Sequence, residues 1–323
     1  MLRPSRSIDK HTGSYLARRR RKRITIALAV FATLGVAAGI IVRLERSGAL
    51  AAAAAARPVP KKKVLDAWDA RDWDSVRASS LASLASAPLD PFYLCFKGLA
   101  SFYKAMELPE GEDRAALLDE AISSLRKSLV VAGRSTPRAQ MQYVLGKAYY
   151  FKGPAYYDES AKFVESSIAA GYAAQDSREY LALAYAGLGE KDRAVGNFEA
   201  ALASSRSELL LLAAARAYID SGAKDKAEAL LQEAVSTGSD ELAREKCRFL
   251  LGDIYRERGD GAKAEAQYSL VLEKDPESAE AHFRLGLVYQ DRGDPVKARA
   301  EWRKAVSLDP MHAAARQKLT EKI

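Results

Sequence analysis

The sequence has 323 residues, of which 50 are Lys or Arg and 42 are Asp or Glu, so its formal net charge is +8. Two cysteines exclude a disulfide-rich scaffold and a multi-cysteine zinc module, and 48% hydrophobic residues exclude wholesale disorder. The positive charge is concentrated at the N-terminus: residues 1–23 hold nine basic residues and one acid, and residues 24–63 hold six and one. Residues 64–323 hold 40 acids and 35 bases, so we expect no phosphate-tracking groove and no nucleic-acid partner there.

Residues 24–42 are nineteen consecutive residues without a charge. At about 1.5 Å per residue they span roughly 28 Å, close to the ~30 Å hydrocarbon core of a bilayer. The basic block at residues 18–23 predicts that residues 1–23 form a cytoplasmic arm and that 24–42 form a signal anchor in the inner membrane, which places the remainder in the periplasm. Basic residues on the other flank weaken this topology. A cleavable signal peptide is the alternative, because Ala51–Ala56 offers small-residue cleavage sites.

Residues 43–63 are predicted to form a juxtamembrane linker rich in Ala, Pro and Lys. The Ala-rich stretch 44–56 favours a continuation of the membrane helix, whereas Pro58 and Pro60 stop any helix and leave residues 57–63 as linker. The basic linker is expected to lie against anionic lipid headgroups, and the acidic remainder is expected to stand clear of them.

From residue 64 on, apolar residues recur at spacings of three and four, which predicts helices and no strands. Residues 64–138 carry this pattern in a divergent form. Residues 65–87 predict one pair of helices around a short turn. Residues 93–98 and 121–129 predict a second pair, joined by an enlarged turn around residues 109–111.

A comparison of the sequence with itself at a shift of 34 residues gives the clearest pattern, over residues 139–312. A small residue precedes a Tyr by three positions, a Gly follows that Tyr by four, and an Ala and a large apolar residue come later. The small residue lets the second helix approach closely, and the Gly ends the first helix. The aromatic is expected to fill the space toward the next repeat, and prolines interrupt the chain between repeats. The signature positions are Gly146, Tyr149, Tyr185, Tyr218, Gly252, Tyr255, Ala264, Pro276, Gly286, Tyr289, Ala298, Trp302 and Pro310.

This pattern resembles the tetratricopeptide repeat, a 34-residue helix–turn–helix unit. The resemblance is most specific over residues 245–312 and extends back to about residue 139. It implies an all-α solenoid of about six to seven helix pairs over residues 64–323, with residues 313–323 as a capping helix. Together with residues 24–42, it implies a membrane-anchored repeat protein.

No catalytic, metal-binding or cofactor-binding motif accompanies the repeats, so we expect no enzyme activity, no metal and no cofactor. His282 and His312 are expected to be solvated or partly packed. Cys95 and Cys247 are expected to be buried apolar residues too far apart in a solenoid for a disulfide. The clamp that binds the C-terminal carboxylates of cytosolic chaperones is not expected, because the single Asn of the chain, Asn197, falls in a second helix.

First helices line the concave surface in solenoids of this type, and their side chains that are not used in packing predict a partner-binding groove. Aromatic residues mixed with Arg are typical of binding hot spots and suit a peptide or a helix. The alternative is that some of these aromatics, Tyr150 and Phe151 above all, belong to the core between repeats. The candidate residues are Tyr143, Lys147, Tyr150, Phe151, Arg216, Phe249, Asp253, Arg256, Phe283, Leu287 and Gln290.

These features predict a non-catalytic, membrane-anchored scaffold or adaptor that binds other proteins in a bacterial envelope complex, of the secretion, envelope-assembly or flagellar-motor type. The alternative is a periplasmic holdase-like chaperone that binds many clients through an aromatic groove. A third hypothesis gives the N-terminal arm a function of its own, gripping anionic lipid or nucleic acid in the cytoplasm. The sequence leaves open the partner, the machine, homo-oligomerisation and cleavage of the anchor.

Overall fold

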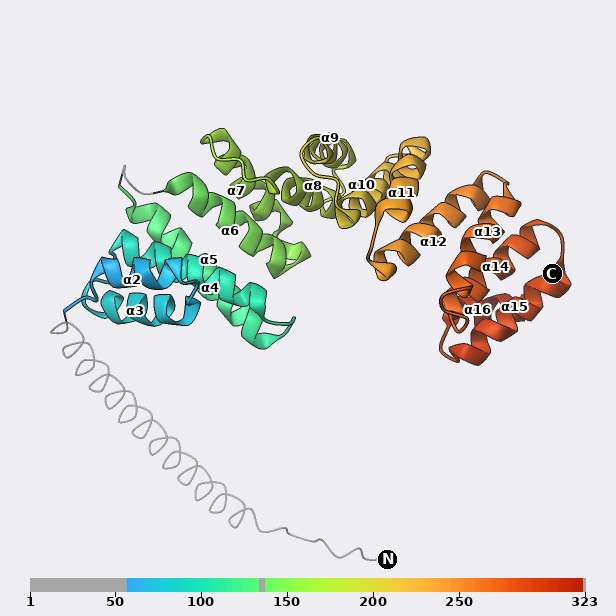
Figure 1. Ribbon diagram of the computed structural model, residues 1–323, viewed down its shortest axis with the longest axis horizontal. Coiled ribbons are helices and arrows are strands. Elements are labelled where there is room, and N and C mark those ends of the chain that lie inside the picture. Colours follow the sequence, from blue (N-terminus) through green and yellow to red (C-terminus); the bar gives the residue numbers. More distant parts are fainter. Residues whose placement is uncertain (1–56, 134–136, 322–323) are drawn as a thin grey trace, which may run out of the picture. The chain divides into compact units, whose positions relative to one another are not determined.

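A computed structural model of the chain describes residues 57–133 and 137–321. These residues form fifteen α-helices and one 3-10 helix, and they contain no strand (Figure 1). The all-α prediction is therefore confirmed. The contacts divide the chain into two units that meet within α4, one ending at Lys97 and the other beginning at Gly98, and each unit is described by itself.

The predicted basic arm, the predicted membrane span and most of the predicted linker lie outside the described residues. Within residues 57–133 and 137–321, none of the helices combines the length and the apolar character that a membrane crossing requires.

The first unit contains α2 (Lys61–Asp69), α3 (Trp73–Ser86) and the start of α4 (Pro91–Glu107). Helix α2 begins three residues inside the predicted linker, because Pro60 occupies its N-cap position, where no backbone N–H donor is required. Its first residue, Lys61, has Nζ 3.6 Å from the Asp90 carboxylate and 5.0 Å from the ring centre of Phe92. These contacts connect the start of α2 to the start of α4.

An aromatic cluster joins the helices of this first unit. The ring of Trp68 lies 5.1 Å from that of Trp73 and 5.3 Å from that of Phe96, both in edge-to-face geometry. Such pairs stabilise a fold beyond the apolar area that they bury. The two Trp residues therefore close the turn between α2 and α3 and pack it onto α4.

The second unit continues with the rest of α4 and then with pairs of consecutive helices, each pair folded into a hairpin. The turn between α4 and α5 has only residues 108–111, so the predicted enlarged turn is wrong. The residues assigned to the enlarged turn lie instead in the helices on either side of it: α4 has 17 residues and α5 has 20. The remaining elements are α5 (Glu112–Val131), α6 (Arg138–Lys152), η1 (Pro154–Tyr156), α7 (Tyr157–Ala169), α8 (Ser177–Gly187), α9 (Lys191–Leu202), α10 (Glu208–Asp220), α11 (Lys224–Thr237), α12 (Glu241–Glu257), α13 (Gly261–Leu272), α14 (Ala279–Asp291), α15 (Pro295–Leu308) and α16 (Ala313–Thr320).

Glycines with positive φ turn the chain between the two helices of a pair. Gly189, Gly222, Gly259 and Gly293 follow α8, α10, α12 and α14 with φ between 75° and 85°. Residues other than Gly rarely adopt this left-handed conformation, so the Gly that follows each signature Tyr is required by the backbone. The prolines Pro276 and Pro310 lie between helix pairs, after α13 and α15, as predicted.

The small residue of the first helix lies against a large side chain of its own pair. A Cβ atom on Gly252 would come within 2.3 Å of the Tyr268 ring, and one on Gly286 within 2.2 Å of the Trp302 indole. The indole Nε1 of Trp302 also donates to the backbone carbonyl of Phe283, 3.2 Å away. At Tyr268 and Trp302 the aromatic therefore locks its own hairpin, a contact that the predicted role toward the next repeat did not include.

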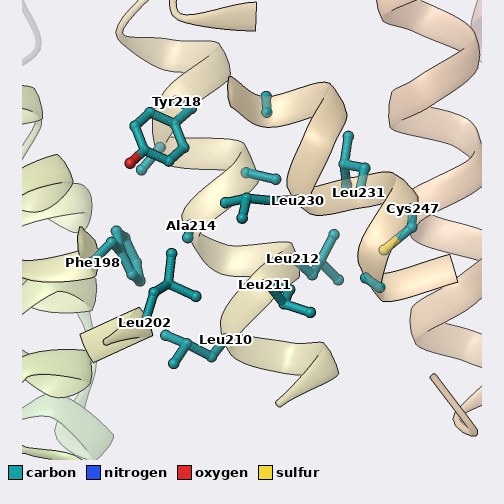
Figure 2. Packing of buried hydrophobic residues seen from close by; sticks show 14 of the residues in the cluster. Phe198, Leu202, Leu210, Leu211, Leu212, Ala214, Tyr218, Leu230, Leu231 and Cys247 are labelled. Atoms are coloured by element: carbon teal, nitrogen blue, oxygen red, sulfur yellow. The ribbon is translucent and has the colours of Figure 1, made fainter. Parts of the chain in front are cut away.

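A buried apolar cluster runs through the second unit from α7 to α14. Figure 2 shows one part of it, to which Phe198 of α9, Leu211 of α10 and Leu231 of α11 contribute; Phe198 and Leu231 lie on opposite sides of α10. The signature positions Ala264 and Ala298 are fully buried, as are Tyr268 and Trp302. Because one cluster spans several pairs, each pair buries part of its apolar surface against its neighbours, as in other repeat solenoids.

From α6 on, a polar link of the signature Tyr joins each pair to the one before it. The hydroxyl of Tyr218 in α10 donates to Glu199 of α9 over 3.0 Å, and Lys226 of α11 contacts the same carboxylate at 2.9 Å. The Tyr149 hydroxyl instead accepts from Arg126 over 2.8 Å. Further copies of the link are Tyr185–Glu165–Arg193, Tyr255–Glu228–Arg258 and Tyr289–Glu265–Arg292.

Candidate functional site

The first helices of successive pairs contact one another, from α6 to α8, from α8 to α10 and from α10 to α12. The ion pair between Arg256 and Asp291, 2.9 Å long, extends this series to α14. We call the surface formed by α6, α8, α10, α12 and α14 the first-helix face. It contains the residues that the sequence predicts as a partner-binding groove, so each of them is placed on it below.

Tyr143 and Lys147 of α6 use their polar atoms within the protein. Lys147 Nζ lies 2.8 Å from a carboxylate oxygen of Asp176 and 3.1 Å from the Tyr143 hydroxyl, which donates to the other oxygen of Asp176. The ammonium also lies 4.3 Å from the ring centre of Tyr180, within the range of a cation–π contact. Burial and the nearby Asp176 raise the pKa of Tyr143, so its hydroxyl stays protonated. The two predicted residues therefore hold α6 to α8.

Tyr150 and Phe151, the next two predicted residues, are half-buried among other aromatic rings. The Tyr150 ring stacks on Tyr157 at 5.3 Å and meets the edge of Tyr180 at 5.3 Å. The Phe151 ring lies 5.7 Å from Tyr180, and the Arg114 guanidinium lies 5.2 Å from the Phe151 ring centre. Both residues therefore contribute to packing between pairs and keep part of their surface accessible.

Glu179 of α8 lies beside this aromatic cluster and was not among the predicted residues. It is half-buried, and within the described part of the chain its carboxylate makes no hydrogen bond and no ion pair. Burial and the neighbouring Asp176 raise its pKa. The charge of Glu179 in turn contributes to the raised pKa values of Tyr150 and Tyr180, after the larger effect of their burial. The Lys147 ammonium opposes the raised pKa of Glu179, so this carboxylate belongs to the same group of interacting charges as Asp176.

A register argument could have found Glu179. Tyr143, Phe249 and Phe283, all predicted, stand three residues before the small residue of their first helix, and Glu179 stands three residues before Ala182. The predicted groove included no residue of α8. The omission of α8, and with it of Glu179, is the main gap in the predicted site.

The middle of the first-helix face carries positive charge. Arg216 of α10 and Lys246 of α12 are exposed, and neither makes an ion pair in residues 57–133 and 137–321. Arg216 lies close enough to Cys247 to lower the pKa of that thiol, although burial, the larger effect, raises it to about 11. Arg216 therefore faces α12 from α10, as a groove residue should.

Charged residues of α12 and α14 pair with each other. Asp253 forms an ion pair with Arg284 and accepts from the Tyr268 hydroxyl over 2.8 Å, while Arg284 also contacts Glu280 at 2.5 Å. The Arg284 guanidinium lies 4.9 Å from the ring centre of Phe249. Of the predicted residues in this region, Phe249, Asp253 and the already paired Arg256 are thus occupied within the protein.

The last predicted residues, Phe283, Leu287 and Gln290 of α14, are half-buried. The ring of Phe283 lies 4.9 Å from that of His312, whose Nδ1 accepts from the backbone N–H of Ala315 at the start of α16. The other ring nitrogen of His312 lies 3.2 Å from Glu280. His312 therefore caps α16 and attaches it to α14.

Two further observations concern chemistry. Among residues 57–133 and 137–321, no group of three or more His, Cys, Asp or Glu side chains is arranged to hold a metal ion. Cys95 and Cys247 are both buried and free, and burial raises the pKa of Cys95 to about 12. Both thiols are therefore protonated near neutral pH and poor nucleophiles.

Residues 252–293 match a family model described as TPR repeat, and residues 279–312 match one described as tetratricopeptide repeat. The C-terminal helix pairs are tetratricopeptide repeats. No curated protein sequence matches the chain. Because the two matches cover the end of α12 from Gly252 on and all of α13, α14 and α15, the repeats found by sequence coincide with the pairs that have the Gly–aromatic contact.

Among solved structures, the C-terminal part of a TPR repeat-containing protein from Cytophaga hutchinsonii is similar at 14% identity, with a TM-score of 0.60. The similarity covers 81% of this chain and 100% of that one, so the tetratricopeptide-repeat fold extends over most of the molecule. A tetratricopeptide repeat protein from Parabacteroides merdae is 18% identical with a TM-score of 0.47, covering 80% and 95%. YrrB, described as a TPR protein with an unusual peptide-binding site, is 19% identical with a TM-score of 0.35, covering 74% and 96%.

Proposed function

We propose that this protein is a non-catalytic scaffold that binds partner proteins through its first-helix face. The observation that carries the proposal is that this face combines half-exposed aromatics, such as Tyr150 and Phe283, with charged groups that have no partner among the described residues, such as Arg216. Aromatic residues and Arg dominate binding hot spots, and repeat solenoids use their extended inner surface for recognition. A peptide or a helix of the partner fits such a surface.

We also propose where the scaffold acts. Residues 24–42 anchor it in the bacterial inner membrane, the basic arm stays in the cytoplasm, and the repeats project into the periplasm. In that setting the partners are proteins of an envelope complex, of the secretion, envelope-assembly or flagellar-motor type. The support is the uncharged stretch of residues 24–42 directly after the basic block of residues 18–23.

A reporter enzyme fused after Ile323 tests the topology. Alkaline phosphatase is active only after export and β-galactosidase only in the cytoplasm. We expect the phosphatase fusion to be active and the galactosidase fusion to be inactive. The opposite result would overturn the periplasmic placement without affecting the repeat fold.

Site-specific photo-crosslinking tests the scaffold. A photoreactive residue at Arg216, on the first-helix face, should capture one or a few partner proteins in intact cells. The same residue at Val296 of α15, which is 78% exposed and outside this face, should capture none. Capture of many unrelated proteins at Arg216, together with suppressed aggregation of unrelated clients, would instead favour the holdase-like chaperone. Equal capture at both positions would count against the first-helix face as the binding surface.

A further inference from the structure

A hollow of about 350 Å³ lies where the turn before α5 meets the end of α6. This volume is at the lower end of the range of ligand-binding pockets. The hollow borders the first-helix face, because Phe151 of α6 is one of its lining residues. The buried side chain of Leu118 gives it an apolar wall. Gly111 and Gly153 contribute only backbone, and a Cβ atom on either would meet nothing within 4 Å, so the hollow is open on these sides.

Arg114 is held in this hollow by an aromatic ring. Its guanidinium lies 5.2 Å from the ring centre of Phe151, within the range of a cation–π contact. A ring contact uses the flat face of a guanidinium, whereas its N–H donors point outward in its plane. In residues 57–133 and 137–321, Arg114 makes no hydrogen bond and no ion pair, and none of its nitrogens is buried away from solvent. The cation is therefore positioned while its donors are free.

Two other arginines of the second unit show how such an arrangement is completed. The guanidinium of Arg193 lies 3.8 Å from the ring centre of Tyr185 and 2.8 Å from a carboxylate oxygen of Glu165. Arg284 likewise combines a ring, 4.9 Å away, with a carboxylate ion pair. Arg114 has the ring but, among the described residues, no carboxylate. The group that it lacks is therefore a carboxylate.

The other charges around the hollow leave Arg114 as the cation that can attract such a group. Lys152 also lines the hollow, but its ammonium is paired with Asp119. Glu110 is the one carboxylate among the described lining residues; it is exposed and lies in the turn before α5. Because Glu110 is not paired with Arg114, it leaves the guanidinium donors accessible, although its charge weakens the attraction of an anion.

We infer that this hollow is a recognition site for an Asp or Glu side chain of the partner protein, and that Arg114 is the residue that contacts it. The inference rests on the proposed scaffold function and specifies the chemistry of the partner. Further along the first-helix face, Arg216 and Lys246 also make no ion pair among the described residues. An acidic partner segment that lies along this face is therefore complementary to cations at both places.

The test uses the full-length protein and three nonapeptides of Leu, Gly and Ser with capped ends and an uncharged fluorescent dye. They differ only at the central residue, which is Glu, Gln or Lys. Binding is measured by fluorescence anisotropy at about 150 mM salt. We expect the Glu peptide to bind about tenfold more tightly than the Gln peptide, as one charge-assisted pair would give, and the Lys peptide to bind least. In Arg114→Gln the ratio of Glu to Gln affinities should fall to about one.

Two further variants make the test specific to the hollow. Glu110→Gln removes the opposing charge from an exposed turn and should raise the ratio about twofold, since exposed charges interact weakly. Arg303→Gln is the matched control, because Arg303 is an exposed arginine of α15 outside the hollow that makes no ion pair among the described residues, and it should leave the ratio unchanged.

The inference is overturned if Arg114→Gln retains the preference for Glu, if Glu110→Gln lowers it, or if Arg303→Gln lowers it as much as Arg114→Gln does. It is also overturned if the Glu peptide does not bind best or if none of the three peptides binds. Crosslinking from Arg216 to a partner, combined with any of these results, would keep the scaffold and remove only the carboxylate site.

Discussion

The first-helix face differs between α6–α8 and α12–α14 in the use of its charged side chains. At α12–α14 the carboxylates of Asp253 and Asp291 are paired with Arg284 and Arg256. At α6–α8 one carboxylate, Asp176, is fully engaged, and the next, Glu179, has no partner in the described residues. The same helix geometry therefore supports two outcomes: a carboxylate that forms an ion pair between helix pairs, and a carboxylate that forms none among the described residues.

The two regions also differ in how the hairpin is closed. In α12–α15 a Gly of the first helix faces an aromatic ring, as Gly286 faces Trp302, whereas Gly146 of α6 faces the aliphatic Val164 of α7. An aromatic buries more area and fixes the crossing more firmly than Val. We therefore expect α12–α15 to be the rigid region and α6–α8 to be the more adaptable one, which suits a binding site.

The largest expected effect comes from removing the aromatic that closes the last hairpin. Trp302→Ala deletes a fully buried side chain and should lower the free energy of unfolding by about 3–5 kcal/mol. Val164→Ala in α7 removes a smaller buried side chain and should cost about 2 kcal/mol. Urea unfolding followed by circular dichroism measures both. Equal losses would remove the proposed difference in rigidity.

Next in size are substitutions of the glycines at the close contacts. Gly286→Ala and Gly252→Ala place a Cβ less than 2.5 Å from a ring and should destabilise by about 1–3 kcal/mol, despite the better helix propensity of Ala. Gly196→Ala in α9 is the control, since its Cβ would meet nothing within 4 Å, and it should stabilise by about 0.5–1 kcal/mol. The sign of the change in thermal midpoint separates the two cases.

The paired and unpaired carboxylates give the third test. Asp253→Asn weakens the ion pair with Arg284, and we expect a loss of about 1–2 kcal/mol in unfolding free energy. Glu179→Gln removes a half-buried charge that has no described partner, so stability should stay unchanged or rise. A loss of stability in Glu179→Gln equal to that in Asp253→Asn would show that Glu179 also serves cohesion.

The smallest effect concerns pH. Burial and Asp176 raise the pKa of Glu179 in the folded protein above 4.5, so folding favours its protonated form. The sign follows by linkage: between 4.5 and the raised pKa, stability decreases as the pH increases, and the penalty is complete above that pKa. Comparison of urea midpoints at pH 4.5 and pH 7 should show that the wild type loses slightly more stability than Glu179→Gln. A larger loss in the variant would contradict the raised pKa.

The repeats could be predicted from the sequence because their determinants are local. A Gly four residues after a Tyr marks a backbone conformation that other residues avoid, and its recurrence from Gly189 to Gly293 fixes both the turn and the period. Small residues such as Gly252 and Gly286 likewise mark helix crossings whatever the neighbouring surface carries. The helix pairs therefore followed from spacing alone.

The polar contacts between pairs could not be predicted in this way. In α9 the Glu that accepts from the signature Tyr is Glu199, one residue after Phe198. In α13 it is Glu265, three residues before Tyr268, so the two positions differ by one helical turn relative to the large side chain. Two positions one turn apart lie on the same helix face, so a fixed spacing does not identify the acceptor. For the same reason, sequence could not show that Lys147 pairs with Asp176 and that Glu179 makes no ion pair among the described residues.

The link between a signature Tyr and the Glu of the preceding pair also bears on how such a chain changes length in evolution. From α8 on, each joint takes its phenol from one pair and its carboxylate from the previous one, as Tyr289 and Glu265 do. Duplication or loss of a segment between equivalent points of two adjacent pairs therefore carries a complete joint with it and creates no unmatched end. The array can grow or shrink by whole pairs while every remaining joint keeps both of its halves.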